Sequence, residues 1–328
     1  MKSNRIPDPF RSAPLRDGLA LPLVVQPDPA RPETADLGKL LEWVAAHKSW
    51  IDDALAVHGG LLFRGFAVAG PEDFQAVVSS YDPALLPYVE GQSQRSRVTS
   101  NVYTSTEYPP SQDITMHNEL SYVRVPPRRL YFFCEIAPEA GGETPIADCR
   151  RVYERIDPAV RSRFMERGVR YVKNMHGGKG FGKSWHDHFE TSDRSVVEEH
   201  LTRAGEEFRW KPNDTLWTSQ KRPAAIAHPE TGETTWFNQA DLWHYSNLGG
   251  KGEALRRTVG EEELPTNSYF GDGTPIDPAD LAAIREVSWR EATVFPWSRG
   301  DLLILDNILA SHGRKAFTGP RRILVAMT

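Results

Sequence analysis

Cysteine and long apolar runs are scarce in this sequence. Its 328 residues include only two cysteines, Cys134 and Cys149, and these do not form a close pair of the zinc-binding type. No apolar run approaches the length of a membrane span or of a signal-peptide core. We therefore expect no membrane partner and a reducing, cytoplasmic location.

An excess of positive charge is also missing. The formal net charge is -5, so a nucleic acid is not expected as a partner. Hydrophobic residues make up 39% of the chain and charged residues 25%, which is ordinary for a globular protein. The length allows one large domain or two small ones, and composition leaves the oligomeric state open.

Short apolar runs bounded by turn residues dominate the chain and predict strands. Helical periodicity or helix-start signals interrupt them without the regular alternation of a parallel α/β sheet. We therefore expect a mainly antiparallel β core with helices packed outside it. The expected strands are 19–25, 60–68, 113–125, 128–137, 141–149, 167–175, 234–240, 292–297, 300–307 and 321–328, and the main expected helices are 34–60, 71–81 and 148–168.

The run "DITMHNELSYVRV", residues 113–125, places a histidine two residues before a glutamate. On a strand, His117 and Glu119 would project from the same face, because successive side chains alternate. An imidazole beside a carboxylate is half of a metal site or of an acid/base pair. Alone, such a pair on a strand is more often simply solvated.

A second histidine lies far downstream, in "GDLLILDNILASHGRKAFTGPRRILVAMT". His312 follows the turn after a continuous apolar strand, with Arg314 beside it and a double arginine after it. Two histidines and one carboxylate, with the third ligand distant in sequence, match the facial triad that holds non-haem Fe(II).

Three motifs together, "HNE", "GGETPIAD" and "DNILASHGRKAFTGPRRILVAM", resemble the taurine dioxygenase (TauD/TfdA) family of Fe(II)/2-oxoglutarate-dependent oxygenases. The likeness covers roughly residues 60–328. Within the family, the segments "VYTSTEYPP", "HNELSY" and "WFNQADLWH" are most similar to enzymes resembling the aspartate hydroxylase of syringomycin biosynthesis. The likeness implies a double-stranded β-helix, a distorted jelly roll. We expect one domain over residues 1–328, with an N-terminal extension of about residues 1–35 and a lid-like insertion at about 175–235.

The resemblance also assigns the site. His117, Glu119 and His312 would be the iron ligands and catalytic residues, and 2-oxoglutarate and O2 would be cosubstrates. Many family members have aspartate where this chain has Glu119; the resemblance associates glutamate with a subset that hydroxylates amino acids.

Two further residues would bind the cosubstrate. Thr144 would hydrogen-bond 2-oxoglutarate, and Arg322 would pair with its distal carboxylate through a bidentate guanidinium. Arg321 and Arg322 are adjacent on an expected strand, so only one can face the pocket, and the family register selects Arg322.

The implied reaction is hydroxylation of an unactivated C–H bond in an amino acid or a derivative, free or held on a carrier protein, in natural-product biosynthesis. Desaturation and cyclisation by the same iron chemistry are alternatives. Four polar residues are candidates for the substrate pocket, and each could equally serve a structural hydrogen bond: Tyr103, Ser105, Asn238 and Gln239.

Other motifs offer competing functions. "GGKGFGKS", residues 177–184, fits the phosphate-binding loop of nucleotide hydrolases, which requires a helix directly after the loop and a parallel sheet. "WHDHF" could bind a metal through His186 and His188, although no third ligand is recognisable. A jelly roll without catalysis could also serve as a binding module.

Overall fold

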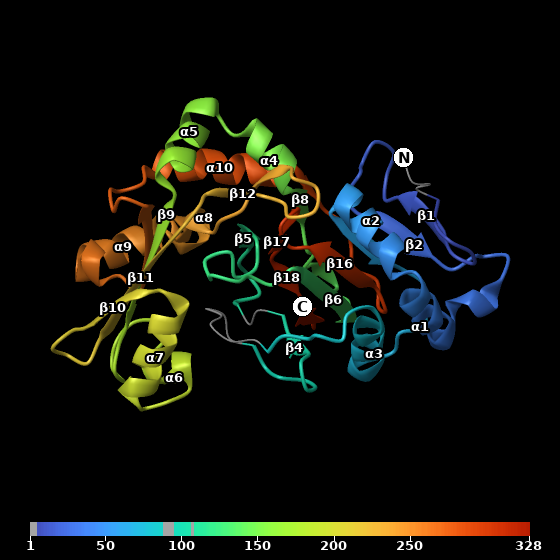
Figure 1. The fold of residues 1–328 in the computed structure, drawn as a ribbon, viewed down its shortest axis with the longest axis horizontal. Coiled ribbons are helices and arrows are strands. Elements are labelled where there is room, and N and C mark those ends of the chain that lie inside the picture. The colour runs from blue at the N-terminus through green and yellow to red at the C-terminus, as the bar shows by residue number, and fades with distance from the viewer. Residues whose placement is uncertain (1–4, 88–94, 106–107) are drawn as a thin grey trace.

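The computed structural model describes residues 5–87, 95–105 and 108–328. Its strands gather into sheets with helices packed around them, which confirms the expected mainly β architecture with flanking helices (Figure 1). The largest sheet has seven strands in the order β1-β2-β3-β16-β6-β19-β4. Their bounds are β1 (Arg11–Pro14), β2 (Leu23–Gln26), β3 (Gly60–Phe63), β16 (Leu302–Asp306), β6 (Arg129–Ile136), β19 (Arg322–Met327) and β4 (Tyr103–Thr104).

Strand β16 lies inside this sheet and is buried on both faces. Its antiparallel neighbours are β3 and β6. Leu302 and Ile304 belong to one apolar cluster, whereas Leu303 and Leu305 belong to another. Burial on both faces explains why this strand is continuously apolar in sequence instead of alternating.

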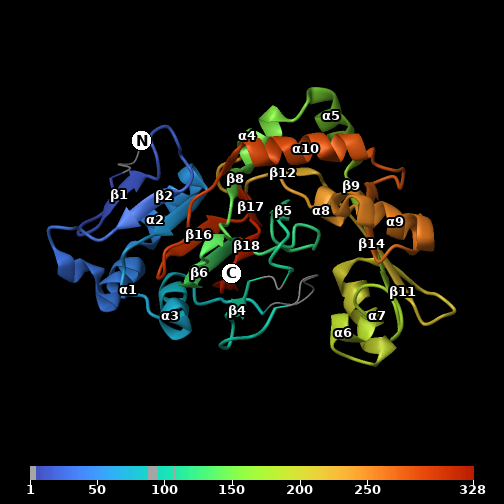
Figure 2. The same cartoon turned by 180° about the vertical axis from the view of Figure 1, so that it is seen from behind.

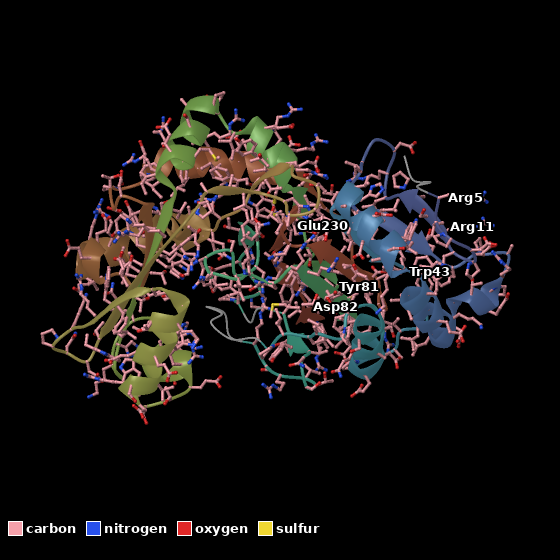
Figure 3. The ribbon with its side chains drawn as sticks, viewed as in Figure 1. Arg5, Arg11, Trp43, Tyr81, Asp82 and Glu230 are labelled. Atoms are coloured by element: carbon pink, nitrogen blue, oxygen red, sulfur yellow. The ribbon has the colours of Figure 1, made fainter. Side chains whose placement is uncertain are left out.

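Three helices contribute to the cluster that contains Leu302 and Ile304: α1 (Leu37–Ala46), α2 (Lys48–His58) and α3 (Pro71–Tyr81). Figure 3 labels Trp43 of α1 and Tyr81 of α3, which are both buried in this layer. The sequence predicted one helix over 34–60, but the chain leaves helical geometry at His47, with φ -120° and ψ 32°, so α1 and α2 are separate.

The range 1–35, predicted as an extension, contains β1 and β2. Strand β2 runs parallel to β3, whereas the other strand pairs of this sheet are antiparallel. These two strands lengthen the edge of the seven-stranded sheet.

A four-stranded sheet in the order β15-β8-β17-β5 carries the residues of greatest functional interest. Its strands are β15 (Ala292–Thr293), β8 (Ile146–Asp148), β17 (Ala310–Arg314) and β5 (Ile114–His117). Three residues, 307–309, connect β16 of the seven-stranded sheet to β17. The two sheets are therefore joined directly at the end of the apolar strand.

Helices α4 (Cys149–Arg155) and α10 (Pro278–Arg290) pack beside this four-stranded sheet (Figures 1 and 2). Helix α5 (Pro158–Arg167) lies farther away and packs through Phe164 against Trp236 and Phe270. The sequence predicted one helix over 148–168, but Pro158 starts a new helix after a break at residues 156–157. No helix in the described part of the chain is long and apolar enough to cross a membrane.

A third sheet, β10-β11-β9-β14, lies farther from the N-terminal layer (Figure 1). It consists of β10 (Glu207–Trp210), β11 (Leu216–Arg222), β9 (Val169–Met175) and β14 (Thr266–Phe270), with α6 (Trp185–Phe189) and α7 (Arg194–Ala204) packed against it. Most of the range 175–235, predicted as a lid-like insertion, lies here, and its action as a lid stays a prediction.

The "GGKGFGKS" loop leads from β9 into α6. Both neighbours of β9 are antiparallel, and α6 has only five residues. A phosphate-binding loop needs a parallel sheet and a substantial helix. The nucleotide-hydrolase interpretation is therefore wrong.

Short elements complete the described fold. They are β7 (Ala140–Gly141), β12 (Ala225–Ala227), β13 (Thr234–Trp236), β18 (Phe317–Thr318), α8 (Ala240–Trp243), α9 (Gly250–Val259), and the 3-10 helices η1 (Pro32–Ala35), η2 (Tyr245–Leu248) and η3 (Glu261–Glu263).

Candidate metal centre

Strands β5 and β17 place two histidines opposite each other. Their antiparallel register pairs His117 with His312, and the two ring centroids are 4.4 Å apart. The carboxylate of Glu119 reaches the same point, with its Oε2 atom 3.8 Å from Nε2 of His312. One potential ligand atom from each of the three residues lies within 4.8 Å of the others. This spacing suits three ligands around one metal ion.

Glu119 reaches the cluster from a turn. Strand β5 ends at His117, and Leu120 has a φ of 50°, in the left-handed region that a non-glycine residue seldom adopts. The predicted strand over 113–125 is therefore too long, and the argument that His117 and Glu119 share a strand face is wrong. Their side chains converge because of the turn instead.

Asn307 holds this turn in place. Its side-chain Oδ1 accepts a hydrogen bond from the backbone N–H of Glu119 at 2.8 Å, and its Nδ2 donates to the carbonyl oxygens of Glu119 and Pro127, each at 2.9 Å. Asn118 in turn donates to the carbonyl oxygen of Asn307 at 2.6 Å. Because Asn307 is completely buried, no water competes for these bonds. The first residue after β16 therefore fixes the backbone that carries Glu119.

The hydrogen bond of His117 sets its tautomer. Nδ1 lies 2.8 Å from the carbonyl oxygen of Thr115, which can only accept, so Nδ1 carries the proton. Burial lowers the pKa of His117, although the Glu119 carboxylate opposes that shift. A neutral ring protonated on Nδ1 leaves the Nε2 lone pair available to a metal.

His312 is neutral for a related reason. Burial holds its pKa well below the usual value, and the neighbouring His117 lowers it further. Neutral imidazole is the form that binds metals. The donor set of the cluster is thus two neutral imidazoles and one carboxylate, which suits Fe(II) and similar divalent metals.

A cavity of about 370 Å³ adjoins the cluster. It is lined from both connected sheets, by Phe132 and Ile323 on one side and His117 and His312 on the other. Its remaining lining residues are Arg95, Ser105, Ile114, Thr144, Gly313, Arg314 and Arg321.

The charges of the cavity lining favour an anionic ligand. Arg314 and Arg321 are both largely buried, and no described residue of the lining is acidic. Burial lowers the pKa of Arg321 to about 10, and the neighbouring charge of Arg314 adds to the effect. A guanidinium shifted in this way is still charged at neutral pH. An anionic ligand would relieve the cost of burying these charges.

Comparison with known proteins decides the family. A family model described as "Taurine catabolism dioxygenase TauD, TfdA family" matches residues 22–328. The chain belongs to the TauD/TfdA family. It is accordingly an Fe(II)/2-oxoglutarate-dependent dioxygenase, of a family whose members use Fe(II), 2-oxoglutarate and O2. The interpretation as a non-catalytic binding module is therefore wrong.

Two curated relatives cover most of the chain. The dapdiamide synthesis protein DdaC of Enterobacter agglomerans is 39% identical over 278 residues, 84% of each chain. A clavaminate synthase-like protein of Arabidopsis thaliana is 32% identical over 327 residues, 97% of this chain and 94% of the relative. Among solved structures, PvcB, an Fe, alpha-ketoglutarate dependent oxygenase from an isonitrile synthetic pathway, matches the fold with a TM-score of 0.56 at 17% identity, covering 98% of this chain and 92% of that chain.

The structure corrects one predicted residue of this TauD/TfdA-family site. Arg321, not Arg322, lines the cavity. Arg322 begins β19 with a half-exposed side chain whose Nε lies 3.0 Å from Oε2 of Glu135. The pairing of β19 with β6 shifts register between Arg322 and Ile323. Arg321 stands two residues before Ile323, which also lines the cavity, so strand alternation puts these two side chains on one face. The choice of Arg322 was therefore wrong by one residue.

Thr144 and Ser105 both line the cavity, and their predicted contacts with the cosubstrate and the substrate stay predictions. The Thr144 hydroxyl accepts a hydrogen bond from the indole Nε1 of Trp297 at 3.1 Å. Arg321 donates from Nη1 to the Ser105 hydroxyl at 3.2 Å and from Nε to the carbonyl oxygen of Gly142 at 2.8 Å. Ser105 therefore helps to orient the guanidinium.

The other predicted substrate residues have structural surroundings. Tyr103 is buried in the apolar cluster that contains Leu303. Asn238 donates to the carbonyl oxygen of Ala224 at 2.7 Å, and Gln239 donates to that of Asn118 at 2.5 Å. A role for these three side chains in substrate binding stays a prediction.

The "WHDHF" histidines do not join a metal cluster. His186 stacks on Trp185, and His188 is buried with its Nε2 3.5 Å from the ammonium of Lys173. In the described parts of the chain, His117, Glu119 and His312 form the one group with metal-binding spacing.

Sequence reasoning missed Asn307 and Arg95. Asn307 had a weak signal, since it directly follows the apolar strand at a turn. Arg95 had none: it lies in a polar segment far from the histidines in sequence, yet its Nη2 is 2.7 Å from Oε2 of Glu119.

Proposed function

We propose that this dioxygenase hydroxylates an unactivated C–H bond of an amino acid or an amino-acid derivative, either free or attached to a carrier protein, in natural-product biosynthesis. The name of its relative DdaC, a dapdiamide synthesis protein, supports the biosynthetic setting. The observation that carries the chemistry is the convergence of His117, Glu119 and His312 beside a cationic cavity.

In this proposal, His117, Glu119 and His312 hold Fe(II). The His117 Nδ1 bond to Thr115 aims Nε2 at the metal, and Asn307 fixes the turn that carries the carboxylate. Both imidazoles are neutral, so no proton must leave before the metal binds. Fe(II), together with 2-oxoglutarate and O2, supplies the oxidising power for C–H cleavage.

Arg321 and Thr144 hold the distal carboxylate of 2-oxoglutarate. The Nε and Nη1 atoms of Arg321 are used by Gly142 and Ser105, and Nη2 has no acceptor among the described residues. A carboxylate could therefore take Nη2 and the Thr144 hydroxyl together. The cavity walls formed by Phe132 and Ile323 exclude water from this ion pair, which strengthens it.

We also infer that the two connected sheets form a double-stranded β-helix. The direct passage from β16 to β17 and the cavity lined from both sheets support this arrangement. The metal cluster would then lie inside the barrel, shielded from bulk water as the chemistry requires.

A mass-spectrometric screen tests the function. The iron-loaded protein is given 2-oxoglutarate, O2 and a panel of amino acids, free and carrier-bound, and succinate and product mass are followed together. We expect one substrate to gain one oxygen atom while succinate rises in step, and the same protein without 2-oxoglutarate to give neither. A product that has lost two hydrogens would show that the reaction is desaturation or cyclisation instead of hydroxylation. A metal-loaded protein that forms no succinate with any substrate would contradict the proposal.

A further inference from the structure

A buried arginine lies inside the proposed metal cluster. The Arg95 side chain is 3% exposed and the Glu119 side chain 7% exposed, and Arg95 Nη2 lies 2.7 Å from Glu119 Oε2. Arg95 also lines the cavity beside His117 and His312. The chain thus places a permanent positive charge at the point where a divalent cation would bind.

Arg95 holds the oxygen that faces the rest of the cluster. Oε2 of Glu119 is 2.7 Å from Arg95 and 3.8 Å from Nε2 of His312, so the guanidinium and the imidazole converge on one atom. A metal bound to His312 would approach the same side of the carboxylate. Arg95 and the metal are therefore rivals for Oε2.

We infer that Arg95 is an internal countercharge that occupies Glu119 in the metal-free protein and competes with the divalent metal. The inference rests on the proposed role of Glu119 as an iron ligand. A buried carboxylate without a partner is strongly unfavourable, so the ion pair stabilises the metal-free site. When the metal arrives, Arg95 must leave Oε2 or share it, and two cations then repel each other where screening by water is weak.

The direction in which metal affinity changes when Arg95 is removed distinguishes competition from the usual orientation of a metal ligand. Groups that strengthen a metal site usually accept a hydrogen bond from the N–H of a metal-bound imidazole, or orient a metal-bound carboxylate without adding charge. Their loss weakens metal binding. A guanidinium on a ligand oxygen withdraws negative charge from it. Removal of Arg95 should therefore strengthen metal binding, at the expense of the metal-free fold.

The test uses Mn(II), which needs no exclusion of oxygen, and measures its dissociation constant from the electron paramagnetic resonance signal of the free ion. We expect Arg95→Met to bind Mn(II) at least about tenfold more tightly than the wild type, a change of about 1.4 kcal/mol. Its metal-free Tm should fall, and Mn(II) should raise its Tm by more than it raises that of the wild type.

Matched variants sharpen the result. Arg97→Met removes an exposed arginine two residues away and should leave the affinity within about twofold of wild type. Arg95→Gln also removes the charge but keeps a donor for Glu119, so it should show the same tightening if Arg95→Met folds poorly. Arg95→Lys retains the charge and should bind Mn(II) about as the wild type does.

The outcomes separate this inference from the proposed function. If the wild type binds Mn(II), His312→Ala does not, and both Arg95→Met and Arg95→Gln bind unchanged or more weakly, the competition is refuted and the metal site stands. If the wild type fails to bind Mn(II), or His312→Ala binds it equally well, the metal site and the inference built on it both fall.

Discussion

Replacing Arg321 by leucine should weaken the binding of 2-oxoglutarate several hundred-fold. Its guanidinium is buried in the cavity, where the lower pKa of about 10 reports the cost of that burial. Removing one partner of a buried ion pair costs about 3–5 kcal/mol, and each 1.4 kcal/mol corresponds to about a factor of ten. Equilibrium dialysis of 2-oxoglutarate against the Mn(II)-loaded protein measures the change without turnover.

The adjacent arginine supplies the control. Arg322 is half-exposed and pairs with Glu135, and neither residue lines the cavity. Arg322→Leu should therefore leave 2-oxoglutarate affinity within about threefold of wild type. Should Arg322→Leu instead cause the large loss and Arg321→Leu the small one, the side-chain directions at the start of β19 would be the reverse of those described.

Replacing Asn307 by alanine should lower metal affinity roughly ten- to hundredfold, the range usual for partners that orient metal ligands. The substitution leaves the backbone N–H of Glu119 and two carbonyl oxygens without their buried partner. The turn can then rotate the carboxylate away from the histidines. Mn(II) titration measures the affinity, and thermal unfolding measures the accompanying loss of stability.

Asn174→Ala separates the two effects of Asn307→Ala. Asn174 is also a buried asparagine that donates to two backbone carbonyls, those of Glu262 and Leu264, but it lies on β9 in the third sheet. Its loss should lower the Tm and leave the Mn(II) dissociation constant unchanged. Equal losses of affinity in both variants would mean that Asn307 acts through global stability alone.

Prediction from the sequence was most accurate for strands whose pattern of apolar residues depends on burial alone. Strand β16 is apolar throughout because both of its faces are covered, and that run could be recognised without the structure. The metal cluster was also predictable, because His117, Glu119 and His312 stand in recognisable motifs. The expected cause of their convergence was wrong, since it assumed a strand where Leu120 turns the chain.

The orientation of a strand that is buried on both faces, the ends of helices and contacts between distant segments could not be predicted. Strand β19 is apolar on both faces, so its sequence does not show that the face of Ile323, and with it Arg321, borders the cavity. No glycine or proline adjoins His47, so nothing in the local sequence marks the break between α1 and α2. Arg95 reaches Glu119 only through the tertiary fold, so its place beside the carboxylate has no counterpart in local sequence.

The most direct test of the metal centre is an anaerobic Fe(II) titration of three proteins: the wild type, His312→Ala and His186→Ala. His312 supplies one of the three converging ligands, whereas His186 stacks on Trp185 outside the cluster. We predict one Fe(II) per chain for the wild type and His186→Ala, with a visible charge-transfer band when 2-oxoglutarate is added, and neither for His312→Ala. Iron binding and the same band in His312→Ala would contradict the assignment of the metal centre.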